Sequence, residues 1–217
     1  MRASFFYEIY AIFDIKINIM PSKKNLAQSL SINIFFLSLC LIFGNLRFGA
    51  NDDIFMSGIL SGMYGQEFNV HLTFVNALYG YVLLPFYHIL PEINWYYIGE
   101  MSSIFISLTI IGYIIIKKVG SNWGMILTSL LVALCASDYY IVLQFTQCAA
   151  MLSAAGMLCC VYGFEIWSAK PENAKVAILT IAIGIILLWW GSWMRWPAFL
   201  MGLSCWISML FAGRWIS

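Results

Sequence analysis

Two adjacent carboxylates, Asp52 and Asp53, are the residues of this sequence best placed to do chemistry. They follow the first long apolar segment, where the chain meets the membrane–water boundary. A charge there is costly unless it has a function or a partner. One carboxylate could serve as a general base toward a hydroxyl or an amine, and a partly dry site would strengthen it as a base. The alternative is that both only cap a helix that starts near Ile54, or that one holds an arginine.

Arg195 is the second candidate, a lone cation within the aromatic run Trp193-Met-Arg-Trp-Pro197. A guanidinium matches the oxygens of a phosphate well, so Arg195 could hold a phosphate group. The alternative is an interfacial arginine that pairs with lipid headgroups or stacks on Trp196.

His71 and Asp138 are weaker candidates for binding an acceptor or a metal. The alternatives are an ordinary interfacial histidine that opens an apolar helix, and an acid at a helix end. Asp52, Asp53 and Asp138 together could supply oxygen ligands to a divalent cation, although nothing in their spacing demands a metal. Glu100 falls inside the start of an apolar segment and is expected to face other helices and pair with a polar neighbour.

Composition assigns the chain to the membrane. Apolar residues make up 62% of it and charged residues 10%, whereas a soluble domain carries about 25% charged residues. The mean hydropathy is +0.86. A net charge of +1 gives no argument for binding nucleic acid. The six cysteines fall in apolar runs without metal-ligand spacing and are expected to be small buried hydrophobes.

The apolar pattern predicts an all-α transmembrane bundle of about six spans with a juxtamembrane or re-entrant helical outer loop. We divide the chain into a cytoplasmic N-terminal segment, residues 1–26, and one transmembrane domain, residues 27–217, whose outer loop covers 47–94. The predicted spans are 28–46, a segment that follows Trp95 and ends at Lys117-Lys118, and then 123–137, 145–164, 176–193 and 197–213.

Residues 70–90 allow two topologies. The segment is long enough to span, but it carries His71, Asn76, Pro85 and His88. If it stays outside, the later basic residues Lys117, Lys118, Lys170, Lys175 and Arg214 share the cytoplasmic side with the N-terminal ones. If it crosses, that bias disappears. The positive-inside rule favours the first model and a cytoplasmic N-terminus.

The outer segment 47–68 is expected to contain a short helix that starts near Ile54 and lies on or against the membrane. Small residues recur at a spacing of four on one face, which suits close packing, in the pairs Ser57/Ser61 and Gly58/Gly62. Apolar side chains lie toward another face: Ile54, Phe55, Ile59 and Met63.

The order of these features resembles the N-terminal half of GT-C membrane glycosyltransferases. It runs span, outer loop with an acidic pair, amphipathic helix, apolar helix, then a span that ends at Lys117-Lys118-Val-Gly120. The resemblance is to the polyprenyl-phosphate-sugar-dependent type, typified by protein O-mannosyltransferases and aminoarabinose transferases, and covers residues 27–200. The acidic pair matches that family's first outer-loop acid. The family's Pro-Pro-Leu motif is absent, and Thr146 stands where many members carry a second acid.

The resemblance implies an integral protein of a bacterial cytoplasmic membrane that serves the cell envelope. It implies transfer of a sugar from a polyprenyl-phosphate carrier to an acceptor on the non-cytoplasmic face, with lipid as the surrounding partner. The lack of later spans and of a soluble domain predicts a short family member or a truncated module. The rival class is a non-enzymatic helical membrane protein: a transporter, a flippase or an assembly partner. A transporter should show mid-span polar residues and internal repeats, and no convincing repeat is found.

Overall fold

The computed structural model describes residues 22–65, 67–169 and 171–201. Regular structure in these ranges is almost entirely helical, which confirms the predicted all-α class. The elements are α2 (Lys23–Phe43), β1 (Arg47–Phe48), α3 (Asn51–Leu60), α4 (Ala77–Ile89), α5 (Trp95–Val119), α6 (Ser121–Ala136), β2 (Val142–Leu143), α7 (Phe145–Ala169) and α8 (Ala174–Met194).

Among the described residues, five helices are long and apolar enough to cross a membrane. They are α2, α5, α6 with the π-helical turn Ser137–Ile141, α7, and α8 with the 3₁₀ turn Pro171–Asn173. They match five of the six predicted spans, and most of the sixth, 197–213, lies outside the described residues. α4 has 13 residues, fewer than the roughly 20 that a crossing requires. This agrees with the prediction that residues 70–90 stay on one side.

Local sequence explains where α5 begins and ends. The side chain of Asn94 accepts a hydrogen bond from the backbone N–H of Tyr97 and caps the first turn. The helix ends at Gly120, whose φ of 99° is easily adopted only by glycine. The chain therefore turns back at once into α6. Lys117 and Lys118 lie in the last turn of α5, where positive charge complements the helix dipole.

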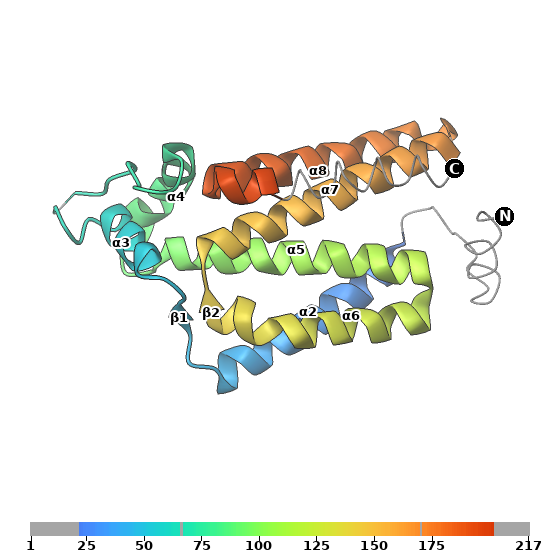
Figure 1. The fold of residues 1–217 in the computed structure, drawn as a ribbon, viewed down its shortest axis with the longest axis horizontal. Helices are drawn as coiled ribbons and strands as arrows, with labels where there is room; N and C mark the ends of the chain where they lie inside the picture. Colours follow the sequence, from blue (N-terminus) through green and yellow to red (C-terminus); the bar gives the residue numbers. More distant parts are fainter. Residues whose placement is uncertain (1–21, 66, 170, 202–217) are drawn as a thin grey trace.

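α5 is the central helix. It packs against α2, α6 and α7, and α8 packs along α7 (Figure 1). The α7–α8 contact depends on glycines: a Cβ added at Gly156 would come within 2.7 Å of the carbonyl oxygen of Gly184. Close approach at small residues is a main source of helix association inside a membrane.

A buried polar network also joins α2 to α5. The Ser29 hydroxyl donates to the carbonyl of Thr109 over 2.7 Å. The Asn33 amide donates to the carbonyl of Phe105 over 2.9 Å, and the Tyr140 hydroxyl donates to the Asn33 side-chain oxygen. Polar groups in an apolar bundle must find such partners, so this network fixes the position of α2 along α5.

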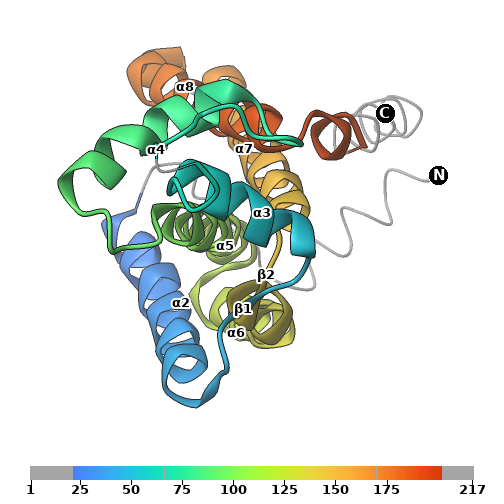
Figure 2. The ribbon, with the colours of Figure 1, turned by 90° about the vertical axis from the view of Figure 1, so that its left-hand side faces the viewer.

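The longer connecting segments gather at one end of the bundle, opposite the short α5–α6 and α7–α8 connections (Figures 1 and 2). There α3 and α4 lie across the ends of the long helices, and β1 pairs with β2 in a short parallel bridge. We call this end, formed by residues 44–65, 67–94, 137–144 and 195–201, the loop end. In α3, Ser57 and Gly58 are buried while Ile54 and Phe55 are exposed, which confirms the predicted division of its faces.

The glycine contact between α7 and α8 can be tested by substitution. Gly156→Leu should lower the stability of the purified protein by about 1–3 kcal/mol, because the added side chain meets backbone that cannot yield. Thermal unfolding in detergent measures this change. Ala150→Leu is the matched control, since Ala150 is exposed on the same helix. Equal melting temperatures for the two variants would contradict the close packing.

The orientation of the bundle can be tested at two exposed glutamates, Glu92 at the loop end and Glu172 between α7 and α8. In a background without native cysteines, Glu92→Cys should react with an impermeant reagent in intact cells. Glu172→Cys should react only after permeabilisation, because the basic residues gather at its end. The reverse pattern would invert the assigned topology, and labelling of both sites from outside would contradict the helix arrangement.

Candidate functional site at the loop end

The two adjacent acids differ sharply in environment. Asp53 is fully buried at 0% exposure, while Asp52 is half-buried. Both lie in the first turn of α3, but neither supplies its cap: Ala50 occupies the N-cap position and no side-chain hydrogen bond caps the helix. Capping therefore does not explain the acidic pair.

Asp53 joins three helices. Its Oδ1 accepts a hydrogen bond from the Tyr96 hydroxyl of α5 over 3.1 Å and another from the backbone N–H of Phe145 over 3.3 Å. Phe145 is the first residue of α7, so this N–H is one of the donors that a helix start leaves unpaired. The carboxyl thus satisfies a donor of α7 while fixing α3 to α5.

Burial raises the pKa of Asp53 above its ordinary value, and the nearby charge of Asp52 raises it further. The hydrogen bonds from Phe145 and Tyr96 act in the opposite direction because they favour the ionised form. Burial is the largest of these effects, so the net direction is upward.

A second buried acid lies beside Asp53. Glu100 is 0% exposed, and its carboxyl lies within hydrogen-bonding reach of the Asp53 carboxyl. The expectation that Glu100 faces the bundle is confirmed, but its neighbour is another acid. The buried oxygens without a hydrogen-bond partner here are Oδ2 of Asp53, both carboxyl oxygens of Glu100, and the hydroxyls of Tyr79 and Tyr97.

Arg195 follows α8 directly and is half-buried at the same end. Its guanidinium carbon lies 4.7 Å from the centre of the Phe145 ring. The predicted stacking on Trp196 is wrong, because that ring packs against Phe199 instead. Within the described ranges, Arg195 makes no ion pair with a carboxylate. Phe145 therefore binds Asp53 through its backbone and Arg195 through its ring.

A groove of about 680 Å³ opens next to Arg195. One wall is the segment before α4, which is fixed to the end of α8 by a 2.8 Å hydrogen bond from the N–H of Asn76 to the carbonyl of Trp193. The lining is mainly aromatic and aliphatic, with three polar side chains: Thr73, Phe74, Val75, Asn76, Leu188, Trp189, Ser192, Trp193, Trp196, Pro197 and Phe199.

The remaining sequence candidates do not join this cluster. His71 is exposed in an irregular segment before α4 and does not open the helix, since Asn76 is the cap. Asp138 is exposed in the π-helical turn. In the part of the chain that the structure describes, no three His, Cys, Asp or Glu side chains are grouped to hold a metal ion. The sequence-based grouping of Asp52, Asp53 and Asp138 around a cation is therefore wrong.

Tyr79, Tyr96 and Phe145 belong to the site but were not predicted. Tyr96 offered one signal: it precedes Glu100 by four residues, so both side chains lie on one face of α5. Phe145 offered none, because its roles depend on a backbone N–H and on a ring that a distant segment approaches.

Comparison with protein-family models, curated proteins and solved structures finds no match to this chain. What the loop end can do is therefore inferred from its own geometry.

The raised pKa of Asp53 makes a signed prediction for stability. Asp53 takes up a proton at higher pH in the folded state than in the unfolded state, so protonation of Asp53 stabilises the fold. This contribution is complete below the ordinary pKa of 3.8 and is lost as the pH rises through the pKa of Asp53 in the folded state. The melting temperature of the wild type minus that of Asp53→Asn should therefore rise as pH falls from neutral toward 3.8. Glu92→Gln, an exposed acid at the same end, should show no such trend. A difference that shrinks on acidification would contradict the assignment.

Proposed function

We propose that this protein is a GT-C-like membrane glycosyltransferase, or a module of one. It transfers a sugar from a polyprenyl-phosphate carrier to an acceptor at the loop end, on the non-cytoplasmic face of a bacterial cytoplasmic membrane. The observation that carries the proposal is the position of Phe145, which links a buried acid of α3 to the cation that follows α8.

Asp52 and Asp53 have different roles in the proposed reaction. Asp53 is fully buried and bound to Tyr96 and Phe145, so it cannot meet a substrate without a rearrangement. It acts as a positioning residue that holds the start of α3. Asp52, half-buried at the protein surface, is the member of the pair that an acceptor can reach. We assign the general base to Asp52.

Arg195 supplies the other half of the reaction. Asp52 takes the proton from the acceptor hydroxyl or amine while the acceptor atom attacks the anomeric carbon of the sugar. The bond between that carbon and the phosphate oxygen breaks, and the lipid phosphate leaves with the bonding electrons. The Arg195 guanidinium has donors that no carboxylate occupies among the described residues, and it lies at the same end to stabilise the leaving phosphate.

The aromatic groove supports a lipid-linked donor. Its walls include Trp193, Trp196 and Pro197, on either side of Arg195 in the sequence. A chain of isoprene units would find apolar surface there while its phosphate stays near the guanidinium. Tryptophans are typical of the membrane–water interface, where such a donor presents its sugar.

One observation favours the non-enzymatic alternative. The carboxyls of Asp53 and Glu100 meet inside a helical membrane protein, and buried acids in such bundles often mark proton or ion pathways. A transporter would use this pair, whereas the transferase uses the surface acid.

Turnover of a polyprenyl-phosphate sugar by membranes that contain the protein separates the two acids. Asp52→Asn should reduce turnover by about 10²–10⁴-fold, the usual contribution of a general base. Its melting temperature should stay near that of the wild type, because the Asp52 side chain is half-buried and makes no hydrogen bond or ion pair with the described residues. Arg195→Ala should also reduce turnover, and Arg195→Lys should restore part of it.

Glu92→Gln is the matched control, since it removes an exposed charge at the same end. Full turnover by Asp52→Asn would remove the base assignment. Full turnover by both Asp52→Asn and Arg195→Ala would remove the transferase proposal.

A further inference from the structure

We propose that Asp53 and Glu100 form a proton-binding site in which the Glu100 carboxyl carries the proton and donates it to Oδ2 of Asp53. The proton has no assigned role in the transfer reaction above, in which Asp53 only holds the start of α3 in position. It can be tested on the protein alone, without any substrate.

The first argument is the cost of charge. Both carboxyls are 0% exposed, and within the described ranges no lysine, arginine or histidine pairs with either. The cation at this end, Arg195, lies over the Phe145 ring. Two adjacent buried carboxylates without a counter-ion cannot both remain ionised, because the negative charge of each raises the free energy of ionising the other. One shared proton removes a charge and supplies the missing hydrogen bond.

The second argument decides which acid carries the proton. Oδ1 of Asp53 receives two donors, the Tyr96 hydroxyl and the Phe145 N–H. Asp53 also lies in the first turn of α3 and at the start of α7, where both helix dipoles favour negative charge. The Tyr96 hydroxyl also lies near Glu100, but neither oxygen of Glu100 forms a hydrogen bond, and the Phe145 N–H donates to Asp53 alone. Asp53 is therefore the ionised member of the pair and Glu100 the protonated one.

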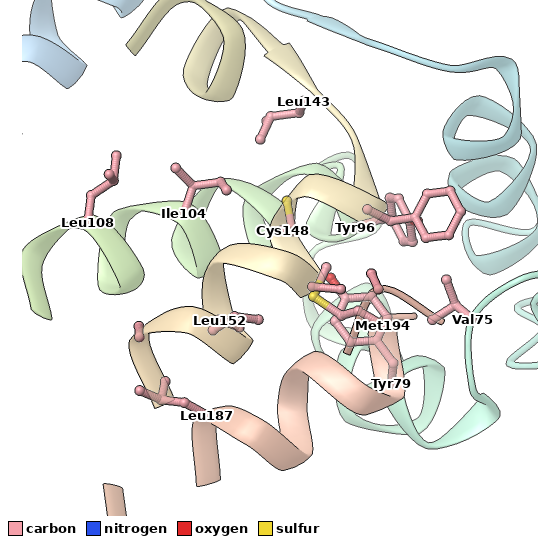
Figure 3. Close-up of a cluster of buried hydrophobic side chains, with 14 of the residues drawn as sticks. Val75, Tyr79, Tyr96, Ile104, Leu108, Leu143, Cys148, Leu152, Leu187 and Met194 are labelled. Atoms are coloured by element: carbon pink, nitrogen blue, oxygen red, sulfur yellow. The ribbon is translucent and has the colours of Figure 1, made fainter. Parts of the chain in front are cut away.

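The surroundings of the pair contain a further buried polar group, the hydroxyl of Tyr79. The Tyr79 hydroxyl is fully buried and has no partner, and its oxygen lies 2.6 Å from where a Cβ of Gly99 would stand, one residue before Glu100. Figure 3 shows Tyr79, Tyr96 and Cys148 gathered at one end of the apolar cluster. These three side chains are the titratable groups that α4, α5 and α7 place near the pair of Asp53 and Glu100.

Tyr97, Cys148 and Asp52 are further titratable groups near the pair, and the Tyr97 hydroxyl is buried without a hydrogen-bond partner among the described residues. The Cys148 thiol donates to the backbone carbonyl of Glu100 over 3.5 Å. This thiol proton therefore does not bind the side-chain carboxyl of Glu100, which can hold a proton of its own. Asp52 adds negative charge next to Asp53, which favours proton binding by the pair. A metal ion is a poorer occupant, because no grouping of three ligand side chains is found in the described part of the chain.

Infrared spectroscopy of the purified protein detects the proton directly. A protonated carboxyl has a C=O stretch that is separate from that of a carboxylate and shifts in D₂O, and the carboxyl of an Asp or Glu in water is ionised at neutral pH. The wild type should keep one such band at neutral pH. Glu100→Gln, which retains the shape and a donor toward Asp53, should lose the band. Glu92→Gln should keep it.

Several outcomes would overturn the assignment. The wild-type spectrum alone is decisive if it contains no protonated-carboxyl band at neutral pH, and this result does not depend on the folding of any variant. Persistence of the band in Glu100→Gln would place the proton elsewhere. Loss of the wild-type band when potassium is replaced by sodium would make the occupant a metal cation. None of these results bears on turnover, so this proposal can fail while the transferase proposal stands, and the reverse.

Discussion

The arrangement of the loop end depends on one buried carboxyl. Asp53 accepts hydrogen bonds from a side chain of α5 and from the backbone at the start of α7, while it belongs to α3 itself. Without this anchor, α3 would keep the hydrogen bond from the Ser57 hydroxyl to the Asn94 side-chain oxygen, and its remaining packing against α5 would be mainly apolar. Apolar contacts fix the angle and the register of a helix poorly. A directional interaction in a dry environment specifies geometry more strongly than the same interaction in water.

The rest of the bundle follows from the cost of polar groups in hydrocarbon. Because lipid is as apolar as the helix surfaces, the hydrophobic effect contributes little to helix association, which depends on close packing and on hydrogen bonds between helices. The glycines of α7 and α8 allow close packing, and the hydrogen bonds of Ser29 and Asn33 join α2 to α5. These contacts hold the long helices, and the helices in turn hold the loop end.

The loop end combines two kinds of site that do different things. The interior pair of Asp53 and Glu100 is closed to solvent and suited to holding a proton. The half-buried Asp52, Arg195 and the aromatic groove are open to ligands. Phe145 contacts both, because its backbone N–H donates to the interior acid and its ring lies under the half-buried cation.

The sequence by itself determined that the chain is surrounded mainly by lipid, that it is helical, and where five of the six predicted spans lie. Long apolar runs have one stable form in lipid, the helix with all its backbone hydrogen bonds internal. The sequence also singled out the acidic pair and Arg195, since charges at such boundaries are rare. It could not show which of Asp52 and Asp53 is buried. Neighbouring residues on a helix point about 100° apart, and only packing against α5 and α7 decides which side chain faces the interior. Nor could the sequence reveal Phe145 or the meeting of Asp53 with Glu100, because residues 53, 100 and 145 come together only when three helices converge. Only the tertiary structure therefore decides that Asp53 forms a buried pair with Glu100, while Asp52 stays near the surface.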